Sequence, residues 1–116
     1  MLLCLIPKVF YADIGVGLDL FVRCLGFALL HQDPSISVLG REKVKVYLMQ
    51  NAELAALDRP EIAIETDDIA AIYAEVLARA SEVLHPNSAS LQRKPWGAQE
   101  FAVRDASKVC VVFRQW

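Results

Sequence analysis

The chain has 116 residues, a formal net charge of −2 and 55% hydrophobic residues, a composition typical of folded globular proteins and not of disordered ones. This length fits one domain, which we place at residues 1–116. The 12 Lys and Arg residues are scattered along the sequence, so no basic patch indicates a nucleic-acid partner.

The cysteines and the N-terminus bear on the cellular compartment. Cys4, Cys24 and Cys110 lie among apolar residues without Cys-x-x-Cys spacing, and we expect them to be reduced and buried. The apolar run Met1–Ile6 is too short for the core of a signal peptide, and no apolar stretch approaches the length of a membrane span. These features predict a cytoplasmic protein without a membrane partner.

In chain order, the first half reads as a strand, a helix and three further strands. The run LCLIPKVFY predicts a strand, and Asp13 after it can cap a helix that ends at Gly26. Apolar residues of that helix recur at helical spacing: Ile14, Leu18, Phe21 and Leu25. The runs FALLH and ISVLG flank the turn QDPS, and KVKVYLM alternates as a half-buried strand does.

The second half repeats this order at a period of about 55 residues. EIAIET predicts a strand, Asp67 and Asp68 can cap a helix, and EFAVRD and VCVVF predict paired strands. The expected apolar positions of this helix are Ile69, Ile72, Val76, Leu77 and Ala80. We therefore expect an α+β fold of two modules, about 1–55 and about 56–116, which need each other to bury a core.

Alternation along the strands sorts their side chains onto two faces. One face is apolar and must be covered by the helices. The other, called the mixed face below, interleaves charged and apolar residues: Lys45, Tyr47, Met49, Glu61, Ala63, Glu65, Glu100, Ala102, Arg104, Cys110, Val112 and Arg114. It is either a solvated outer surface or, as the interleaving favours, the lining of a ligand cavity on a curved sheet.

Three segments carry a resemblance to a known family: CLGF (24–27), ETDDIAAIYAEV (65–76) and, most specifically, PWGAQEFAVRDASKVCVVF (95–113). Together with the doubled unit, they resemble the glyoxalase, bleomycin resistance protein and extradiol dioxygenase superfamily, and are most similar to its bleomycin resistance branch. The resemblance implies two βαβββ modules that form a cupped mixed sheet with helices on the convex face. It also implies a homodimer whose ligand sites contain residues of both chains.

The resemblance further implies where metal ligands would stand. The enzymes of the superfamily bind a divalent metal through His and Glu side chains at positions that correspond here to Ile6, Glu61 and Val112. Of these only Glu61 can bind a metal, whereas a usable Lewis acid needs about three protein ligands. The turn DASK replaces the usual Asp-Pro-x-Gly, but a register shift of one residue would bring Val111 or Phe113 to the last position, and neither is a ligand. We therefore expect no metal cofactor and assign no catalytic residue.

The remaining interpretation is a metal-independent small-molecule-binding protein, with antibiotic sequestration as one form. The resemblance implies that Trp96 stacks on a planar ligand, although a contact with a dimer partner explains this tryptophan equally well. His31 and Ile36 stand where drug-binding members carry Phe, and Ala63 where some carry Trp. The full set of expected ligand-binding residues is Trp96, Tyr47, Glu61, Ala63, Glu100, His31 and Ile36.

Two alternatives stay open. One is a glyoxalase-type lyase or a related metal-dependent enzyme that uses Glu61 with His31 or His85, which occupy equivalent places in the two modules. The other is a non-catalytic protein-interaction module with no small ligand.

Overall fold

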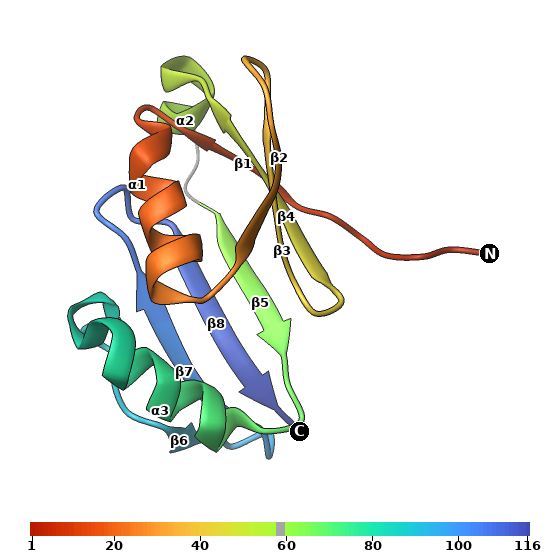
Figure 1. The fold of residues 1–116 in the computed structure, drawn as a ribbon. Coiled ribbons are helices and arrows are strands. Elements are labelled where there is room, and N and C mark those ends of the chain that lie inside the picture. Colours follow the sequence, from red (N-terminus) through yellow and green to blue (C-terminus); the bar gives the residue numbers. More distant parts are fainter. Residues whose placement is uncertain (58–59) are drawn as a thin grey trace.

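Two four-stranded sheets with the same internal order form the framework of the protein (Figure 1). The structure is a computed structural model that describes residues 1–57 and 60–116. The first sheet has the order β1-β4-β3-β2, with β1 (Lys8–Tyr11), β2 (Ala28–Gln32), β3 (Ser37–Arg41) and β4 (Val44–Gln50). The second has the order β5-β8-β7-β6, with β5 (Glu61–Glu65), β6 (Gln92–Arg93), β7 (Gln99–Arg104) and β8 (Cys110–Gln115). β1 runs parallel to β4, and β5 runs parallel to β8, whereas the other neighbouring strands are antiparallel. Both sheets therefore have the same topology, which confirms the doubled unit of the α+β fold.

The helices begin where the sequence predicts. α1 (Ile14–Leu18) continues directly into η1 (Asp19–Cys24), a stretch of π-helix, and α3 (Ile69–Ala80) continues into the short helix η2 (Ser81–Val83). The carboxylate of Asp13 accepts a hydrogen bond from the backbone N–H of Gly15 at 2.9 Å, and that of Asp68 accepts one from Ala71 at 3.1 Å. Gly26, which follows the first helix, has a φ of 73°. The helix α2 (Ala52–Leu57) was not predicted from the sequence.

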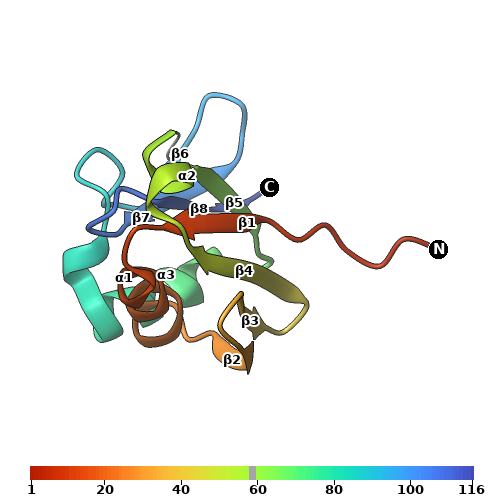
Figure 2. The ribbon, with the colours of Figure 1, turned by 90° about the horizontal axis from the view of Figure 1, so that it is seen from above.

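The apolar faces of both sheets pack against α1, η1 and α3, which lie on the same side of the molecule (Figures 1 and 2). The core cluster therefore contains residues of both modules, among them Val9, Tyr11, Leu48, Val76, Phe101 and Val111. Polar contacts join the modules as well: the hydroxyl of Tyr11 donates to Asp105 Oδ2 at 2.6 Å, and Arg41 forms an ion pair with Glu75. One residue expected in the core is not there, since Leu77 is 43% exposed.

Gly17 lies inside this core, on the first helix, directly against the ring of Tyr11. A Cβ atom placed on Gly17 would stand 2.4 Å from Tyr11 Cε2 and 2.6 Å from Tyr11 Cζ. Such distances are far shorter than a van der Waals contact. The absence of a side chain at this position therefore lets the helix approach β1.

The N-terminal segment differs from the prediction. The expected strand starts only at Lys8, and residues 1–7 extend away from the body of the protein (Figures 1 and 2). Pro7 lacks the N–H that a ladder requires, which explains why the strand starts after it. Cys4 lies on this exposed segment and Cys110 is half-buried, so the expectation of three buried thiols holds only for Cys24.

The turn between β7 and β8 keeps its tight form without glycine. Lys108 takes the positive φ, 67°, and the backbone N–H groups of Lys108 and Val109 are bonded to Asp105. β8, which follows the turn, has Val112 opposite Ala102 on β7 and opposite Ala63 on β5. In the part of the chain that the structure describes, no helix has the length and apolar character needed to cross a membrane.

Candidate functional site

The mixed face of the second sheet consists of three cross-strand rows. The register of β5, β8 and β7 aligns Glu65, Arg114 and Glu100 in one row and Glu61, Cys110 and Arg104 in another. Between them lies a row of small apolar side chains, Ala63, Val112 and Ala102. Because neighbouring strands are about 4.8 Å apart, this middle row forms a floor that extends roughly 10 Å across the three strands, between the two rows that carry the charged side chains. Ala63 is exposed, whereas Val112 and Ala102 are only 8% and 4% exposed.

Trp96 stands at the end of this face, in the connection between β6 and β7. The backbone N–H of Gly97 donates to the carbonyl of Lys94 at 2.9 Å, which places Pro95 and Trp96 at the two central positions of a β-turn. Pro95 has the φ that the first of these positions requires. Gly97 has a φ of 103°, and its carbonyl accepts a hydrogen bond from Arg93 at 2.9 Å. The turn therefore has a defined shape and holds a tryptophan that is 56% exposed.

Glu100 links Trp96 to the sheet. Its Oε2 atom accepts a hydrogen bond from the indole N–H of Trp96 at 3.1 Å and another from Arg114 Nε at 2.7 Å. Glu100 is only 8% exposed. Burial by itself would raise the pKa of the Glu100 carboxyl, but the hydrogen bonds from Arg114 and Trp96 outweigh it and lower that pKa. Glu100 is therefore a charged acceptor that fixes the edge of the indole ring.

The other predicted residues lie on the first sheet. Tyr47 on β4 stands opposite Val38 on β3, which stands opposite His31 on β2, so Tyr47 and His31 belong to one row. His31 Nε2 lies 2.7 Å from Asp33 Oδ2, and the backbone N–H of Ile36 donates to Asp33 Oδ1 at 3.0 Å. The hydrogen bond from His31 and those from the turn backbone lower the pKa of Asp33.

The structure thus divides the seven predicted residues into two groups. Trp96, Glu100, Glu61 and Ala63 share the mixed face of the second sheet, whereas Tyr47, His31 and Ile36 belong to the first sheet. Across residues 1–57 and 60–116, no hydrogen bond or ion pair joins the two groups.

Arg114 is a site residue that the sequence reasoning did not select. Its predicted place on the mixed face is correct, but its ion pair with Glu100 depends on the register between β7 and β8. Counting outwards from the tight turn at 105–108 would place Glu100 opposite Phe113. The observed pairing of Arg104 with Cys110 leaves Val109 in the connection and brings Arg114 opposite Glu100 instead, so no direct signal for this pair exists in the sequence.

The donor set at the positions of the superfamily's metal ligands does not suit a metal. Ile6 belongs to the extended N-terminal segment, Glu61 is an exposed carboxylate on β5, and Val112 carries no donor. Among the residues that the structure describes, no three His, Cys, Asp or Glu side chains form a group able to hold a metal ion. His31 and His85 each bond within a local turn, His85 Nδ1 accepting from the N–H of Asn87 at 3.1 Å. Metal independence stays a prediction.

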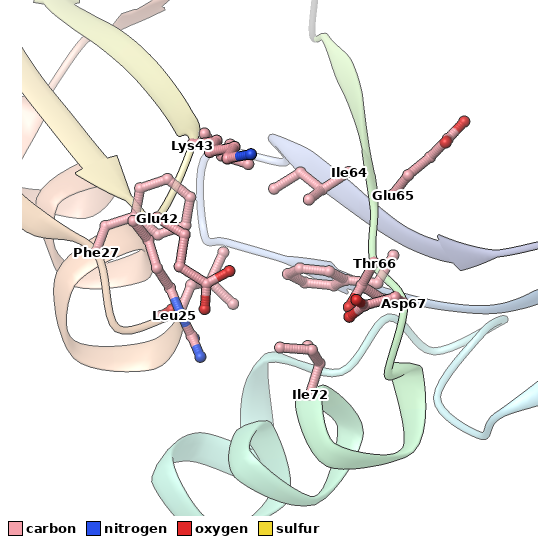
Figure 3. Close-up of a pocket in the computed structure, with 12 residues that line it drawn as sticks. Leu25, Phe27, Glu42, Lys43, Ile64, Glu65, Thr66, Asp67 and Ile72 are labelled. Carbon is pink, nitrogen blue, oxygen red and sulfur yellow. Dashed lines mark hydrogen bonds between the residues drawn. The ribbon is translucent and has the colours of Figure 1, made fainter.

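A groove between the two modules has a volume of about 570 Å³ (Figure 3). Glu42 and Lys43 lie on one side of it, Ile64, Thr66 and Asp67 on the other, and Phe27 and Ile72 point into it. None of the predicted ligand-binding residues lines it. Its phenylalanines, Phe27 and Phe113, are each only 5% exposed, so the surface that this groove offers to a ligand is mainly that of its exposed charged residues, Glu42, Lys43, Glu65 and Asp67. The rim of a neighbouring hollow of about 550 Å³ includes Glu61 and Ala63.

Comparison with known proteins places the fold. No family model matches the sequence, and no curated protein matches it either. Among solved structures, the chain is similar to a bleomycin-binding protein complexed with bleomycin, with a TM-score of 0.81, 16% identity, and coverage of 97% of this chain and 98% of that one. It is also similar to the bleomycin-binding protein from the bleomycin-producing Streptomyces verticillus, complexed with copper(II)-bleomycin, with a TM-score of 0.77, 22% identity, and coverage of 97% and 95%.

A third similar structure is a glyoxalase/bleomycin resistance protein/dioxygenase from Alicyclobacillus acidocaldarius, with a TM-score of 0.77, 16% identity, and coverage of 97% and 89%. The chain therefore has the fold of the glyoxalase and bleomycin resistance proteins over nearly its whole length, as its sequence motifs predict. Fold similarity of this kind leaves the ligand and the chemistry to be argued from the site.

Proposed function

We propose that this protein binds a flat small molecule on the mixed face of its second sheet, without a metal, and that it sequesters the ligand rather than transforming it. The observation that carries the proposal is the half-exposed indole of Trp96, held by a buried carboxylate next to a floor of small side chains. An aromatic face of this kind stacks on planar groups and attracts cations.

The binding surface is completed by a second copy of the chain in this proposal. The mixed face of the first sheet carries Lys8 and Lys45, whereas that of the second sheet carries Glu61, Glu65 and Arg104 in addition to the Glu100–Arg114 pair and so has one more acid than base. These opposite charges suit a homodimer in which the first sheet of one copy faces the second sheet of the other. Tyr47 and His31 would then enter the same site as Trp96 and Glu100.

Bleomycin is the first ligand to test, because two proteins of the same fold were solved with it or with its copper complex. Trp96 and Trp116 are the two tryptophans of the chain, so a Trp116→Phe variant leaves Trp96 as the single fluorescent indole. We expect bleomycin or copper(II)-bleomycin to quench its emission in a saturable way. Trp96→Ala in the unmodified background should weaken binding measured by calorimetry by roughly tenfold, which corresponds to the loss of one stacked ring. If bleomycin produces neither heat nor quenching at concentrations up to about 100 times a Kd of about 1 μM, bleomycin is rejected as the ligand.

The metal-independent part of the proposal has its own measurement. Protein purified without a His tag is incubated with Zn, Ni, Mn and Fe(II), desalted and analysed by elemental mass spectrometry. We expect no retained ion, and about one ion per chain would overturn this part and favour a lyase-type enzyme that uses Glu61 with His31 or His85. Sedimentation of the same sample tests the dimer. The cytoplasmic location expected from the sequence stays a prediction.

A further inference from the structure

We propose that Glu100 is a positioning residue of the ligand site, which holds the Trp96 indole in one orientation before any ligand arrives and so reserves its ring face for stacking. The inference rests on the proposed function, because it describes how that site is prepared.

The first step of the argument is the direction of the indole N–H. A tryptophan that is 56% exposed has water available for its N–H group, which usually finds a partner at the wet end of the ring. Here the N–H donates inwards, to a carboxylate that is only 8% exposed. The part of the indole that faces solvent therefore offers a π surface without a hydrogen-bond donor.

The second step is the role of Arg114. Its Nε atom donates to the same Oε2 atom that accepts from Trp96, at 2.7 Å. The ion pair neutralises the carboxylate and fixes its orientation on the sheet, since Glu100 and Arg114 stand directly opposite each other on β7 and β8. Glu100 is consequently not the counter-ion of a cationic ligand. The exposed carboxylates Glu61 and Glu65 on β5 take the role of counter-ion instead.

The third step is the turn that holds the backbone of Trp96. The bonds from Gly97 to Lys94 and from Lys94 to the carbonyl of Ala98, at 2.7 Å, close the loop without contacting the indole ring. These bonds fix the Cα position but leave the two side-chain torsions of Trp96 free. The bond to Glu100 is the one hydrogen bond of the indole N–H in the described structure, and it selects a single rotamer.

These contacts define the class of ligand that the platform accepts. A flat aromatic group, neutral or cationic, gains from the exposed ring, whereas a ligand that relies on an acceptor bonded to the indole N–H gains nothing. A ligand that had to order a free indole would bind roughly three- to tenfold more weakly, because immobilising a side chain at an interface costs entropy.

A measurement without ligand tests the positioning directly. In the Trp116→Phe background, time-resolved fluorescence anisotropy reports the motion of Trp96 alone. We expect Glu100→Ala and the similarly sized Glu100→Met, neither of which can accept the bond from the indole N–H, to increase the amplitude of the sub-nanosecond decay about twofold. Glu53→Gln, at an exposed position of α2, should leave it unchanged. An unchanged decay in a folded Glu100→Met protein overturns the proposal, and circular dichroism verifies that the variants are folded.

Titration with 1-methylquinolinium, a planar cation, and with copper(II)-bleomycin then separates the two proposals. Weaker binding by about three- to tenfold in Glu100→Met, but not in Glu53→Gln on α2, supports the positioning role. Equal binding by Glu100→Met and its parent rejects it even if the indole has become mobile. If the parent protein binds neither probe while the anisotropy responds to Glu100→Met, the proposed function fails for these ligands and the orientation of Trp96 by Glu100 stands.

Discussion

Replacing Gly17 by alanine tests how tightly the first helix is packed against β1. Two effects of opposite sign compete. Alanine is better than glycine inside a helix by about 1 kcal/mol, but its Cβ atom would stand 2.4 Å from Tyr11 Cε2. The ring cannot retreat easily, because Tyr11 is fully buried and its hydroxyl is bonded to Asp105 at 2.6 Å. Overpacking of this kind typically costs 1–3 kcal/mol, occasionally more.

Because the Cβ atom would meet three atoms of the ring at 2.4–2.9 Å, the steric cost should lie in the upper part of this range, about 2–3 kcal/mol. After the gain of about 1 kcal/mol in helix propensity is subtracted, we expect Gly17→Ala to lower the free energy of unfolding by about 1–2 kcal/mol. For a domain of this size that loss corresponds to a decrease in Tm of roughly 4–10 °C. Thermal and urea unfolding followed by circular dichroism measure it. Gly15→Ala is the matched control on the same helix, since a Cβ atom there would meet only the side chain of Asp13, at 3.1 Å from Oδ1. We expect that variant to be as stable as the parent or slightly more stable. A Gly17→Ala protein that melts at or above the parent temperature would refute the close packing of helix and ring.

Two further predictions concern the second sheet. The pKa of Glu100 lies below its ordinary value of 4.5, so the contribution of the ionised carboxylate to stability is fully present above pH 4.5 and is lost as the pH falls through the folded-state pKa. Urea unfolding between pH 7 and pH 3 should show this loss of stability in the parent and a smaller loss in Glu100→Gln. Parallel curves of stability against pH for the two proteins would contradict this prediction. Lys108 has a φ of 67°, a conformation that costs a non-glycine residue about 1 kcal/mol. We therefore expect Lys108→Gly to raise the free energy of unfolding by up to about 1 kcal/mol, whereas the control Ser107→Gly should not raise it. A lower free energy of unfolding in Lys108→Gly would show that the turn is not strained.

Much of the fold could be predicted from the sequence because its signals are local. Alternation along β4 separates Val46 and Leu48, which are buried, from exposed Lys45, since successive side chains of a strand point to opposite faces. Asp13 and Asp68 cap their helices through hydrogen bonds within the next few residues. Such features depend on a few neighbouring residues and on no distant contact.

What the sequence did not reveal depends on distant partners. Leu77 follows Val76 by one position on α3, so it is turned about 100° away from the buried stripe, and only the packing shows on which side that stripe ends. The strand predicted from residue 3 needs donors that Pro7 lacks. At the site, the sequence predicts the exposed ring of Trp96, but its bond to Glu100 depends on the conformation of the turn 94–97 and on the register of β7 and β8.

The core shared by the two modules makes the duplicated chain a single cooperative unit. Each sheet alone has an apolar face that only the helices cover, and these helices contact one another as well as both sheets. Neither half can open without exposing apolar surface of the other, so the slowest-exchanging amides of β4 and β8 should report the same global event. A ligand held on the second sheet of one copy would then protect the first sheet of the same copy from unfolding as well. A repeat that is visible in the sequence is thus not a repeat in the energetics of the protein.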